Sequence, residues 1–445
     1  PIRSSINEVT NGEASSESFE WWSLVILALA GLIAIGVLGR VLDRPVTDGE
    51  VQRLTSAHKF WLAVTFSNLK FSAKVLIMLV LVSATSVVIF GYFDYQAAKE
   101  TLEKESFNKL TAVREMKAQQ IENYFGTLND LVVTFAQSDT AIEAAKGFRA
   151  AFEDIQQDVS TDSFTEKSLE KYYESEFITR LAPNMLDSSG LVARDFISPN
   201  PATQYLQKTY IADNPYPTGE KDKLYRLEDG SSYDVAHTRH HPVFRKLLET
   251  FGFYDIFILD PKDGYILYSV FKEVDYGTSL LTGPYKDSNF AAAYRMVMQN
   301  PKPGTAILVD FEPYRPSYNA PAAFIASPIF ESRELVGVAI FQMPIDRINS
   351  IMTSNQSWSD VGLGKSGETY IVGEDFRMRN QSRFLIEDEE NYYKAIQNSG
   401  VPSDTVKSIK AFNSTVGLQK VETRGTIAAL SGQTNTEIFP DYRNI

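Results

Sequence analysis

The sequence contains no cysteine. This absence excludes disulfides, thiolate catalysis, iron–sulfur clusters and cysteine-based zinc sites together. Histidine is scarce as well, and three of the 4 histidines cluster at His237, His240 and His241. A zinc-protease motif would need Glu at position 238, where the chain has Thr238. We therefore predict no metal site and no cofactor, and we interpret the cluster as solvent-facing histidines at a helix cap.

Basic residues are in the minority, with 43 Lys and Arg against 56 Asp and Glu and a formal net charge of -13. A nucleic-acid surface needs concentrated Lys and Arg to neutralise phosphates. The sequence contains no basic stripe with interleaved aromatic residues. Nucleic acid is therefore excluded as a main partner.

Catalytic signatures are missing too. No nucleophile elbow and no Ser-His-Asp order occurs. The stretch GLGKSG (362–367) resembles a phosphate loop, but such a loop needs glycine at position 359, where the chain has Ser359. A strand-like sequence follows it, whereas phosphate binding requires a helix N-terminus. We predict a simple turn there, and we expect no enzyme activity from these residues; a catalytic domain would have to lie beyond residue 445.

Two long uncharged runs are present, at 21–39 and 75–93. Each has 19 residues, which at about 1.5 Å per residue just crosses a hydrocarbon core of roughly 30 Å. Trp21 and Trp22 begin the first run and Tyr92 and Phe93 end the second, where interfacial aromatic residues belong. We predict two transmembrane helices.

The loop between the two runs, 40–74, is rich in Lys and Arg, whereas the N-terminal tail, 1–20, is acidic and holds only Arg3 as a basic residue. Positive charge is retained on the cytoplasmic side of a membrane. We therefore place the loop in the cytoplasm, and both the tail and the large C-terminal region outside it.

Residues 94–136 contain no proline and one glycine, Gly126. Apolar residues recur there at helical spacing: Leu110, Val113, Ile121, Tyr124, Leu128, Leu131 and Phe135. We predict a long stalk helix that continues the second transmembrane helix. Its apolar stripe packs on its own domain, and nearest the membrane we expect it to pair with a second copy in a homodimer.

Beyond the stalk the pattern predicts an α+β region with two tandem PAS-like modules. Helices are expected at 139–158, 163–181 and 287–299, and strands at 252–260, 265–271, 304–311, 321–330 and 335–343. These elements predict an antiparallel sheet with helices on one face. A linking helix (343–355) and a strand-turn-strand stretch (362–379) begin a smaller second module, which looks incomplete because the chain ends where a hairpin partner is expected.

Several segments, in order, resemble the double Cache sensor regions of bacterial transmembrane receptors. They are VREMKAQQIENYFGTL (113–128), NPYPTGEKDKL (214–224), the long stretch from His241 to Asn289, YNAPAAFIASPIF (318–330), IFQMPIDRINSIM (340–352) and GLGKSGETYIVG (362–373). The middle segments look most like the versions that front adenylate or guanylate cyclases and methyl-accepting chemotaxis proteins. The resemblance implies a bacterial inner-membrane protein with a periplasmic ligand-binding region, whereas the family's usual third transmembrane helix, HAMP linker and effector are not seen.

The expected organisation follows from these segments. It comprises an acidic periplasmic tail (1–20), transmembrane helix 1 (21–39), a basic cytoplasmic loop (40–74), transmembrane helix 2 (75–93), a stalk helix (94–136), a membrane-distal Cache module (137–343) and a truncated membrane-proximal Cache module (344–445).

A ligand pocket is expected between the first module's sheet and its overlying loops, where aromatic walls and a few polar groups orient a ligand. The candidate residues are Tyr254, Asp255, Tyr268, Lys272, Asp310, Tyr318 and Asn319. Strand alternation implies that Tyr254 and Asp255 cannot both face one pocket. A lysine beside two aspartates would clamp an amino acid or a carboxylate, and an amine also stays open. The alternative is that these aromatic residues belong to the core and the charges are exposed.

The sequence is compatible with two functions. The first is a membrane-anchored extracytoplasmic sensor that binds a small organic molecule. The second is a non-enzymatic accessory or scaffold subunit of a bacterial membrane complex, which reuses a Cache region and docks to other membrane subunits through transmembrane helix 1.

Overall fold

The computed structural model describes residues 70–158, 163–434 and 436–443. The predicted tail (1–20), transmembrane helix 1 (21–39) and most of the predicted cytoplasmic loop lie outside the described residues. The chain divides into two compact units, residues 1–104 and 105–445. In the first unit the described part is the beginning of helix α3 (Phe71–Ala136).

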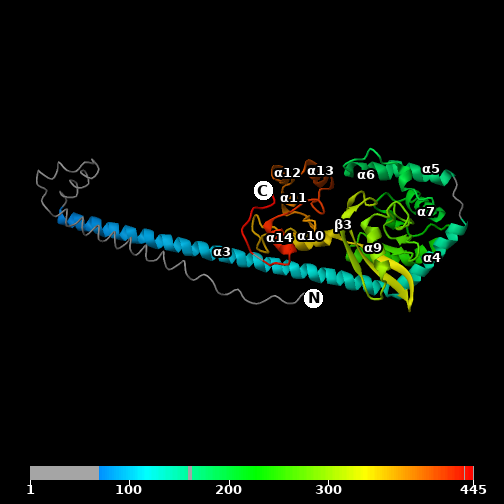
Figure 1. Ribbon diagram of the computed structural model, residues 1–445, viewed down its shortest axis with the longest axis horizontal. Helices are drawn as coiled ribbons and strands as arrows, with labels where there is room; N and C mark the ends of the chain where they lie inside the picture. Colours follow the sequence, from blue (N-terminus) through cyan, green and yellow to red (C-terminus); the bar gives the residue numbers. More distant parts are fainter. Residues whose placement is uncertain (1–69, 159–162, 435, 444–445) are drawn as a thin grey trace. The chain divides into compact units, whose positions relative to one another are not determined.

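Helix α3 has 66 residues and joins the predicted second span and the predicted stalk in one uninterrupted element (Figure 1). The helical prediction for 94–136 is therefore confirmed. Among the described residues, α3 is the one helix that is long and apolar enough to cross a membrane. Its most apolar window has a mean hydropathy of 2.4, and none of that window is buried. Leu79, Val87 and Phe90 are 61%, 71% and 69% exposed.

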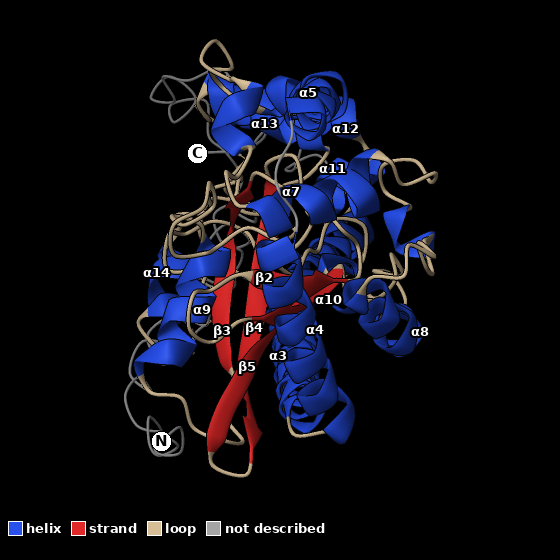
Figure 2. Ribbon diagram, turned by 90° about the vertical axis from the view of Figure 1, so that its right-hand side faces the viewer, coloured by secondary structure: helices blue, strands red, loops and turns tan. Residues whose placement is uncertain are grey.

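The second unit contains one antiparallel sheet of five strands in the order β2-β1-β5-β4-β3. The strands of this sheet are red in Figure 2. The strands are β1 (Asp255–Leu259), β2 (Ile266–Ser269), β3 (Ile307–Tyr314), β4 (Ala320–Glu331) and β5 (Glu334–Gln342). All five overlap the predicted strands, and the class α+β is confirmed. Every residue of β1 and β2 is buried, which requires a cover on each face of the sheet.

Helices cover both faces of this sheet, so the prediction of helices on one face is wrong. α9 (Asn289–Gln299) packs on the face that carries Phe257 and Phe324, since its Phe290 lies 4.6 Å from each ring. α4 (Asp139–Asp158) packs on the opposite face, where Phe148 stacks on Tyr268 at 4.7 Å. The approach of α4 is close at Gly337 of β5, where an added Cβ would lie 2.8 Å from that of Ala145.

A helix that the sequence did not predict, α8 (Ser232–Phe251), contains the histidine cluster. The Ser231 side chain accepts the Asp234 amide at its start, and Gly252 ends it with φ 75°. His237, His240 and His241 are 0%, 5% and 1% exposed. The prediction of solvent-facing cap histidines is therefore wrong, because they lie inside the helix on its buried side.

The remaining elements of this unit are short. They are α5 (Ser163–Tyr172), a π-helical turn (Tyr173–Ile178), α6 (Thr179–Leu181), α7 (Pro201–Gln207), a second π-helical turn (Lys208–Ala212) and 3-10 turns at Ala182–Asn184, Ala193–Phe196 and Lys221–Lys223.

Residues 344–443, here called the C-terminal segment, begin with α10 (Ile345–Thr353) at the predicted linking helix. α11 (Arg383–Glu387), α12 (Glu389–Asn398), α13 (Ser403–Phe412) and α14 (Arg424–Leu430) follow. The described residues of this segment form no strand, and the predicted strand-turn-strand is an isolated bridge between Val372 and Met378. A second PAS-like sheet is therefore not confirmed; a lone hairpin is marginal without a third strand beside it.

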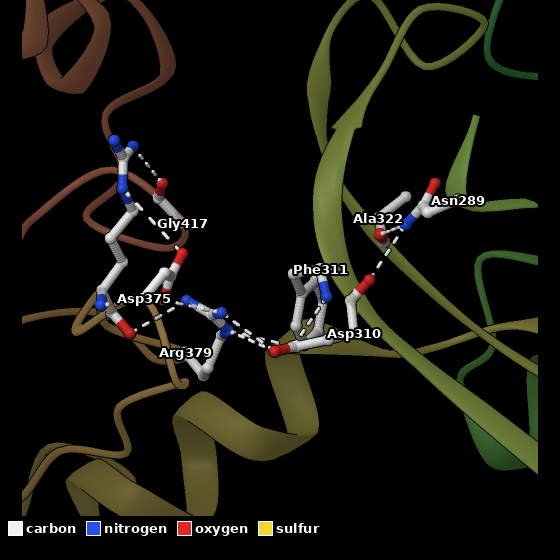
Figure 3. A network of polar contacts seen from close by, with 8 residues as sticks. Asn289, Asp310, Phe311, Ala322, Asp375, Arg379 and Gly417 are labelled. Carbon is white, nitrogen blue, oxygen red and sulfur yellow. Dashed lines mark hydrogen bonds and ion pairs between the residues drawn. The ribbon is translucent and has the colours of Figure 1, made fainter. Parts of the chain in front are cut away.

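The C-terminal segment has a small core of its own around Tyr392, Ile396 and Ile409. Several contacts join it to the rest of the second unit, and two of them involve α3 and β3. Val113 of α3 is buried in a cluster with Trp358 and Leu363, and Asp310 of β3 pairs with Arg379 (Figure 3).

Candidate functional site

A cavity of about 550 Å³ lies at the end of the sheet where β1 begins and β5 ends. We call it the acidic cavity. Its wall comes from three places: the sheet end with the loop after β2, the tip of the β3–β4 hairpin, and the C-terminal segment, which contributes α10 and residues farther along the chain. The lining residues are Tyr254, Asp255, Phe271, Glu273, Ser317, Tyr318, Ala320, Pro321, Gln342, Ile345, Asp346, Asn349, Gln381, Phe412, Asn413 and Ser414.

Asp255 is the first residue of β1 and pairs in register with Gln342, the last residue of β5. The residue is 1% exposed, and its carboxylate accepts the Ser269 hydroxyl at 2.6 Å and the Val270 and Phe271 amides at 2.9 and 3.0 Å. Burial raises the pKa of Asp255 to about 7, against the opposing effect of these hydrogen bonds. The carboxylate is thus held rigidly, with its charge sensitive to what enters the cavity.

The loop after β2 adds a second carboxylate, Glu273, which accepts the Ser317 hydroxyl at 2.7 Å. Burial, and then the nearby charge of Asp275, raise the pKa of Glu273 to about 8. Asp275 lies behind it, accepts the Tyr314 hydroxyl at 2.5 Å, and has a pKa raised to about 6 by burial. Its other oxygen, Oδ1, has no hydrogen-bond partner among the described residues. Glu273 therefore lies in the cavity wall, with the buried Asp275 behind it.

The hairpin tip is held in an uncommon backbone conformation. Tyr318 and Asn319 have φ of 54° and 67°, which costs a residue with a side chain about 1 kcal/mol or more. The Ala320 amide closes the turn on the Ser317 carbonyl at 3.0 Å. Asn184 clamps the tip from outside, since its amide donates to the Tyr318 carbonyl at 2.9 Å and its carbonyl accepts from Asn319 at 3.1 Å. These contacts fix Tyr318 in the cavity wall.

The C-terminal segment closes the other side of the acidic cavity. The Asn349 side chain of α10 accepts the Gln381 amide at 2.6 Å, and the Gln381 side chain donates to the Asn413 carbonyl at 2.7 Å. Asp346 of α10 accepts the Tyr254 hydroxyl at 3.4 Å. The wall is therefore complete only when this segment is docked on the sheet end.

The charges of the wall have one sign. Asp255, Glu273 and Asp346 line the cavity, and the lining contains no Lys or Arg. Four aromatic rings accompany the acids, from Tyr254, Phe271, Tyr318 and Phe412. Carboxylates and aromatic faces both attract a positively charged group. The cavity therefore suits a cationic guest.

Three of the predicted pocket residues, Tyr254, Asp255 and Tyr318, lie together in this wall. Strand alternation predicted that Tyr254 and Asp255 would not share a pocket. They do share one, because β1 begins only at Asp255 and the cavity lies at the strand end rather than over a face.

The other four predicted residues lie elsewhere. Asn319 holds the hairpin tip on Asn184. Tyr268 is buried on the α4 face, with its hydroxyl 2.6 Å from Nδ1 of His241. Lys272 is 1% exposed, and its Nζ donates to the Val270 carbonyl at 2.8 Å. Asp310 pairs with Arg379, so the lysine and aspartates of the predicted clamp have other partners.

Sequence reasoning missed several wall residues. Glu273 carries a usable signal, because FKEVD (271–275) concentrates charge directly after a predicted strand. Gln381 and Asn413 carry no such signal, because the sequence places them far along the chain, in a predicted separate module.

No protein-family model matches the chain, and no protein of curated function matches it in sequence. Two solved structures are similar to it. The sensor domain of the V. cholerae histidine kinase DctB is 12% identical, with 46% of this chain and 60% of that chain covered and a TM-score of 0.20. The ligand-binding domain of the Campylobacter jejuni chemoreceptor Tlp3, in complex with 4-methylisoleucine, is 8% identical, with 59% and 81% covered and a TM-score of 0.23.

The chain spans about three fifths of the DctB sensor domain that it matches. Both neighbours are sensory domains of signalling proteins.

Proposed function

We propose that this chain is the membrane-anchored, extracytoplasmic sensor region of a bacterial signal-transduction protein, and that it binds a small organic amine in the acidic cavity. The observation that carries the proposal is the cavity itself. Its volume of about 550 Å³ lies in the range typical of small-molecule sites, roughly 300–1,000 Å³. Its three carboxylates have no basic residue beside them in the lining.

Membrane anchoring is the second part of the proposal. The beginning of α3 is uncovered and apolar, as a lipid-facing helix should be. The basic loop before it favours a cytoplasmic start, and the ligand-binding unit then lies outside the cytoplasm. The multi-pass inner-membrane topology, with a first span at 21–39, and the resemblance to double Cache regions of cyclases and chemoreceptors belong to the same proposal.

A physical route leads from the acidic cavity to α3. Asp346 and Asn349 of α10 line the cavity. At the other end of α10, Nζ of Lys117 in α3 donates to the Ile351 carbonyl and, at 2.6 Å, to the Ser354 hydroxyl. A ligand that shifts α10 therefore acts on the stalk helix through a direct polar contact, and small helix shifts are a known way of passing a signal.

The stalk also supports the proposed homodimer. Leu110 of α3 is 46% exposed, whereas Val113 is 5% exposed because the C-terminal segment covers it. Pairing of two copies through α3 would use Leu110 and the exposed Leu102.

The test is a thermal-unfolding screen of the full chain in detergent against alkylamines, amino acids, dicarboxylates and nucleobases. An amine at 100 times its Kd should stabilise the chain by about 2.7 kcal/mol. Glu273→Gln should abolish the effect, and Glu331→Gln, an exposed glutamate at the far end of β4, should leave it unchanged.

A well-folded chain that no small molecule stabilises contradicts the sensor proposal. It would favour the accessory-subunit function instead. Stabilisation that survives Glu273→Gln would place the ligand outside the acidic cavity.

A further inference from the structure

A second cavity, of about 610 Å³, lies between α3 and α10 within the second unit. We call it the stalk cavity. α10 contributes Arg347, Ser350 and Ile351 to it, and these lie on the helix face opposite to Ile345 and Asn349 of the acidic cavity. The two cavities are therefore separate sites on the two sides of one helix.

The charged residues that line the stalk cavity have the opposite sign to those that line the acidic cavity. Lys117 and Arg347 line it, and its lining contains no Asp or Glu. The other polar groups of the wall are neutral: Gln120, Asn123, Tyr124, Thr127, Ser350, Ser354 and Asn355. A wall of two cations and several hydrogen-bond donors is the chemistry that recognises an oxyanion.

Lys117 has an unusual environment for a charged residue. It is 4% exposed, whereas lysine is almost never so buried unless it is paired with an acid. Its described partners are the Ile351 carbonyl and the Ser354 hydroxyl, and it forms no ion pair with any described residue. Burial without a counter-charge lowers the pKa of Lys117. A bound anion would supply the charge that the wall lacks.

Two further groups of the stalk cavity, on Tyr124 and Arg347, indicate that it binds a ligand. The Tyr124 hydroxyl is buried and has no hydrogen-bond partner among the described residues. Arg347 is exposed and forms no ion pair within the described parts of the chain, although its charge acts on Tyr124. A donor and a cation near one another thus remain available in the cavity wall.

We propose that the stalk cavity is an anion site that binds a carboxylate or phosphate group between Lys117 and Arg347. The guanidinium of Arg347 matches the paired oxygens of such a group, Lys117 supplies the buried charge, and the Tyr124 hydroxyl donates to it. The bound anion bridges α3 and α10. The proposal does not rest on amine binding in the acidic cavity.

The experiment titrates inorganic phosphate and malonate into the full chain in neutral detergent, at ionic strength held constant with sodium chloride. Binding is measured by calorimetry. We expect saturable binding in excess of any chloride effect, and at least tenfold weaker binding in Arg347→Gln and in Lys117→Met. Lys246→Gln, an exposed lysine on α8 that lines neither cavity, is the matched control and should bind as the unaltered chain does.

A parallel arm uses nanodiscs with and without anionic phospholipid. Binding of phosphate or malonate in detergent identifies a soluble anion as the guest. Stabilisation by anionic lipid alone, lost in Arg347→Gln, identifies a lipid headgroup with the same chemistry. The proposal is overturned if no anion binds beyond chloride, or if Arg347→Gln, an exposed substitution that leaves folding intact, binds with unchanged affinity.

Discussion

The ion pair between Asp310 and Arg379 should decide how firmly the C-terminal segment is docked on the sheet. Nε of Arg379 donates to Oδ1 and Oδ2 of Asp310 at 2.9 and 3.0 Å, and Nη2 donates to Oδ2 at 2.9 Å (Figure 3). Arg379 also pairs with Asp375 at 2.9 Å within its own segment. Asp310→Asn therefore removes the link across to β3 and leaves the arginine with one acid.

The size of the expected loss in docking free energy follows from the burial and charge of the two side chains. Hydrogen bonds to charged groups contribute roughly 1.5–3 kcal/mol. The side chain of Asp310 is 59% exposed, so solvent screening reduces this value. We expect Asp310→Asn to destabilise docking by about 1 kcal/mol, which corresponds to roughly a fivefold larger open population. Arg379→Ala should cost more, about 2–3 kcal/mol, because its side chain is only 10% exposed and both acids lose their partner.

Hydrogen exchange of the full chain followed by mass spectrometry measures this opening. The informative amides are those of Met378 and Gly417, which bond to the Gln419 and Met378 carbonyls at 3.0 and 2.7 Å. These bonds lie within the C-terminal segment beside Arg379, so they report how far the segment loosens when its link to β3 is lost. The two amides should exchange about fivefold faster in Asp310→Asn. Glu312→Gln, a change of an exposed acid on the same strand, is the matched control. Unchanged exchange in Asp310→Asn, or equal acceleration in the control, would refute the reasoning.

Three further predictions concern the cavity, the stalk and the sheet. Amine binding in the acidic cavity should strengthen from pH 6 to 8.5, because Glu273, whose pKa is raised to about 8, must lose its proton to pair with a cation. Over the same range the ligand-free chain should lose stability, since a raised folded-state pKa stabilises only the protonated form. Calorimetry of Glu273→Gln should lack the binding trend, and its melting curves should show a weaker loss of stability, to which Asp255, with a pKa raised to about 7, still contributes. Disulfide crosslinking should succeed at Leu110→Cys, which is 46% exposed, and fail at Val113→Cys, which is 5% exposed; no crosslink at either position would count against the stalk dimer. Gly337→Ala should lower the Tm, at a cost of about 1–3 kcal/mol, because its Cβ would lie 2.8 Å from a neighbouring Cβ. Gly147→Ala, in the interior of α4 with its nearest contact at 3.9 Å, should instead raise the Tm, and equal shifts at the two glycines would contradict the packing argument.

Local patterns predicted most of the elements. α4 was expected at 139–158 and occupies those residues, and the β1–β2 hairpin forms around the turn at 261–264. α8 was missed because Pro242 lies inside it, and a proline normally ends a helical pattern. The helix continues because burial of Tyr233, Phe244 and Leu248 on one side stabilises it, which no local signal reveals.

The candidate site was predictable only where the strands form it. Asp255 and Tyr318 belong to the strand and hairpin that the alternation predicted. Lys272 looked like a ligand clamp, yet its left-handed backbone, with φ of 59°, accompanies a side chain that bonds to the loop itself. The wall from Gln381 to Ser414 depends on tertiary docking of a distant segment, and periodicity carries no information about such contacts.

α10 is a short element with a cavity on each side, and this has a thermodynamic consequence. Whatever factor an amine imposes on the affinity for an anion, the anion must impose on the affinity for the amine, because binding free energies are linked reciprocally. If α10 favours one position when both guests are bound, the region responds to the coincidence of two chemicals rather than to the concentration of either. A background anion would then set the threshold at which the amine is detected.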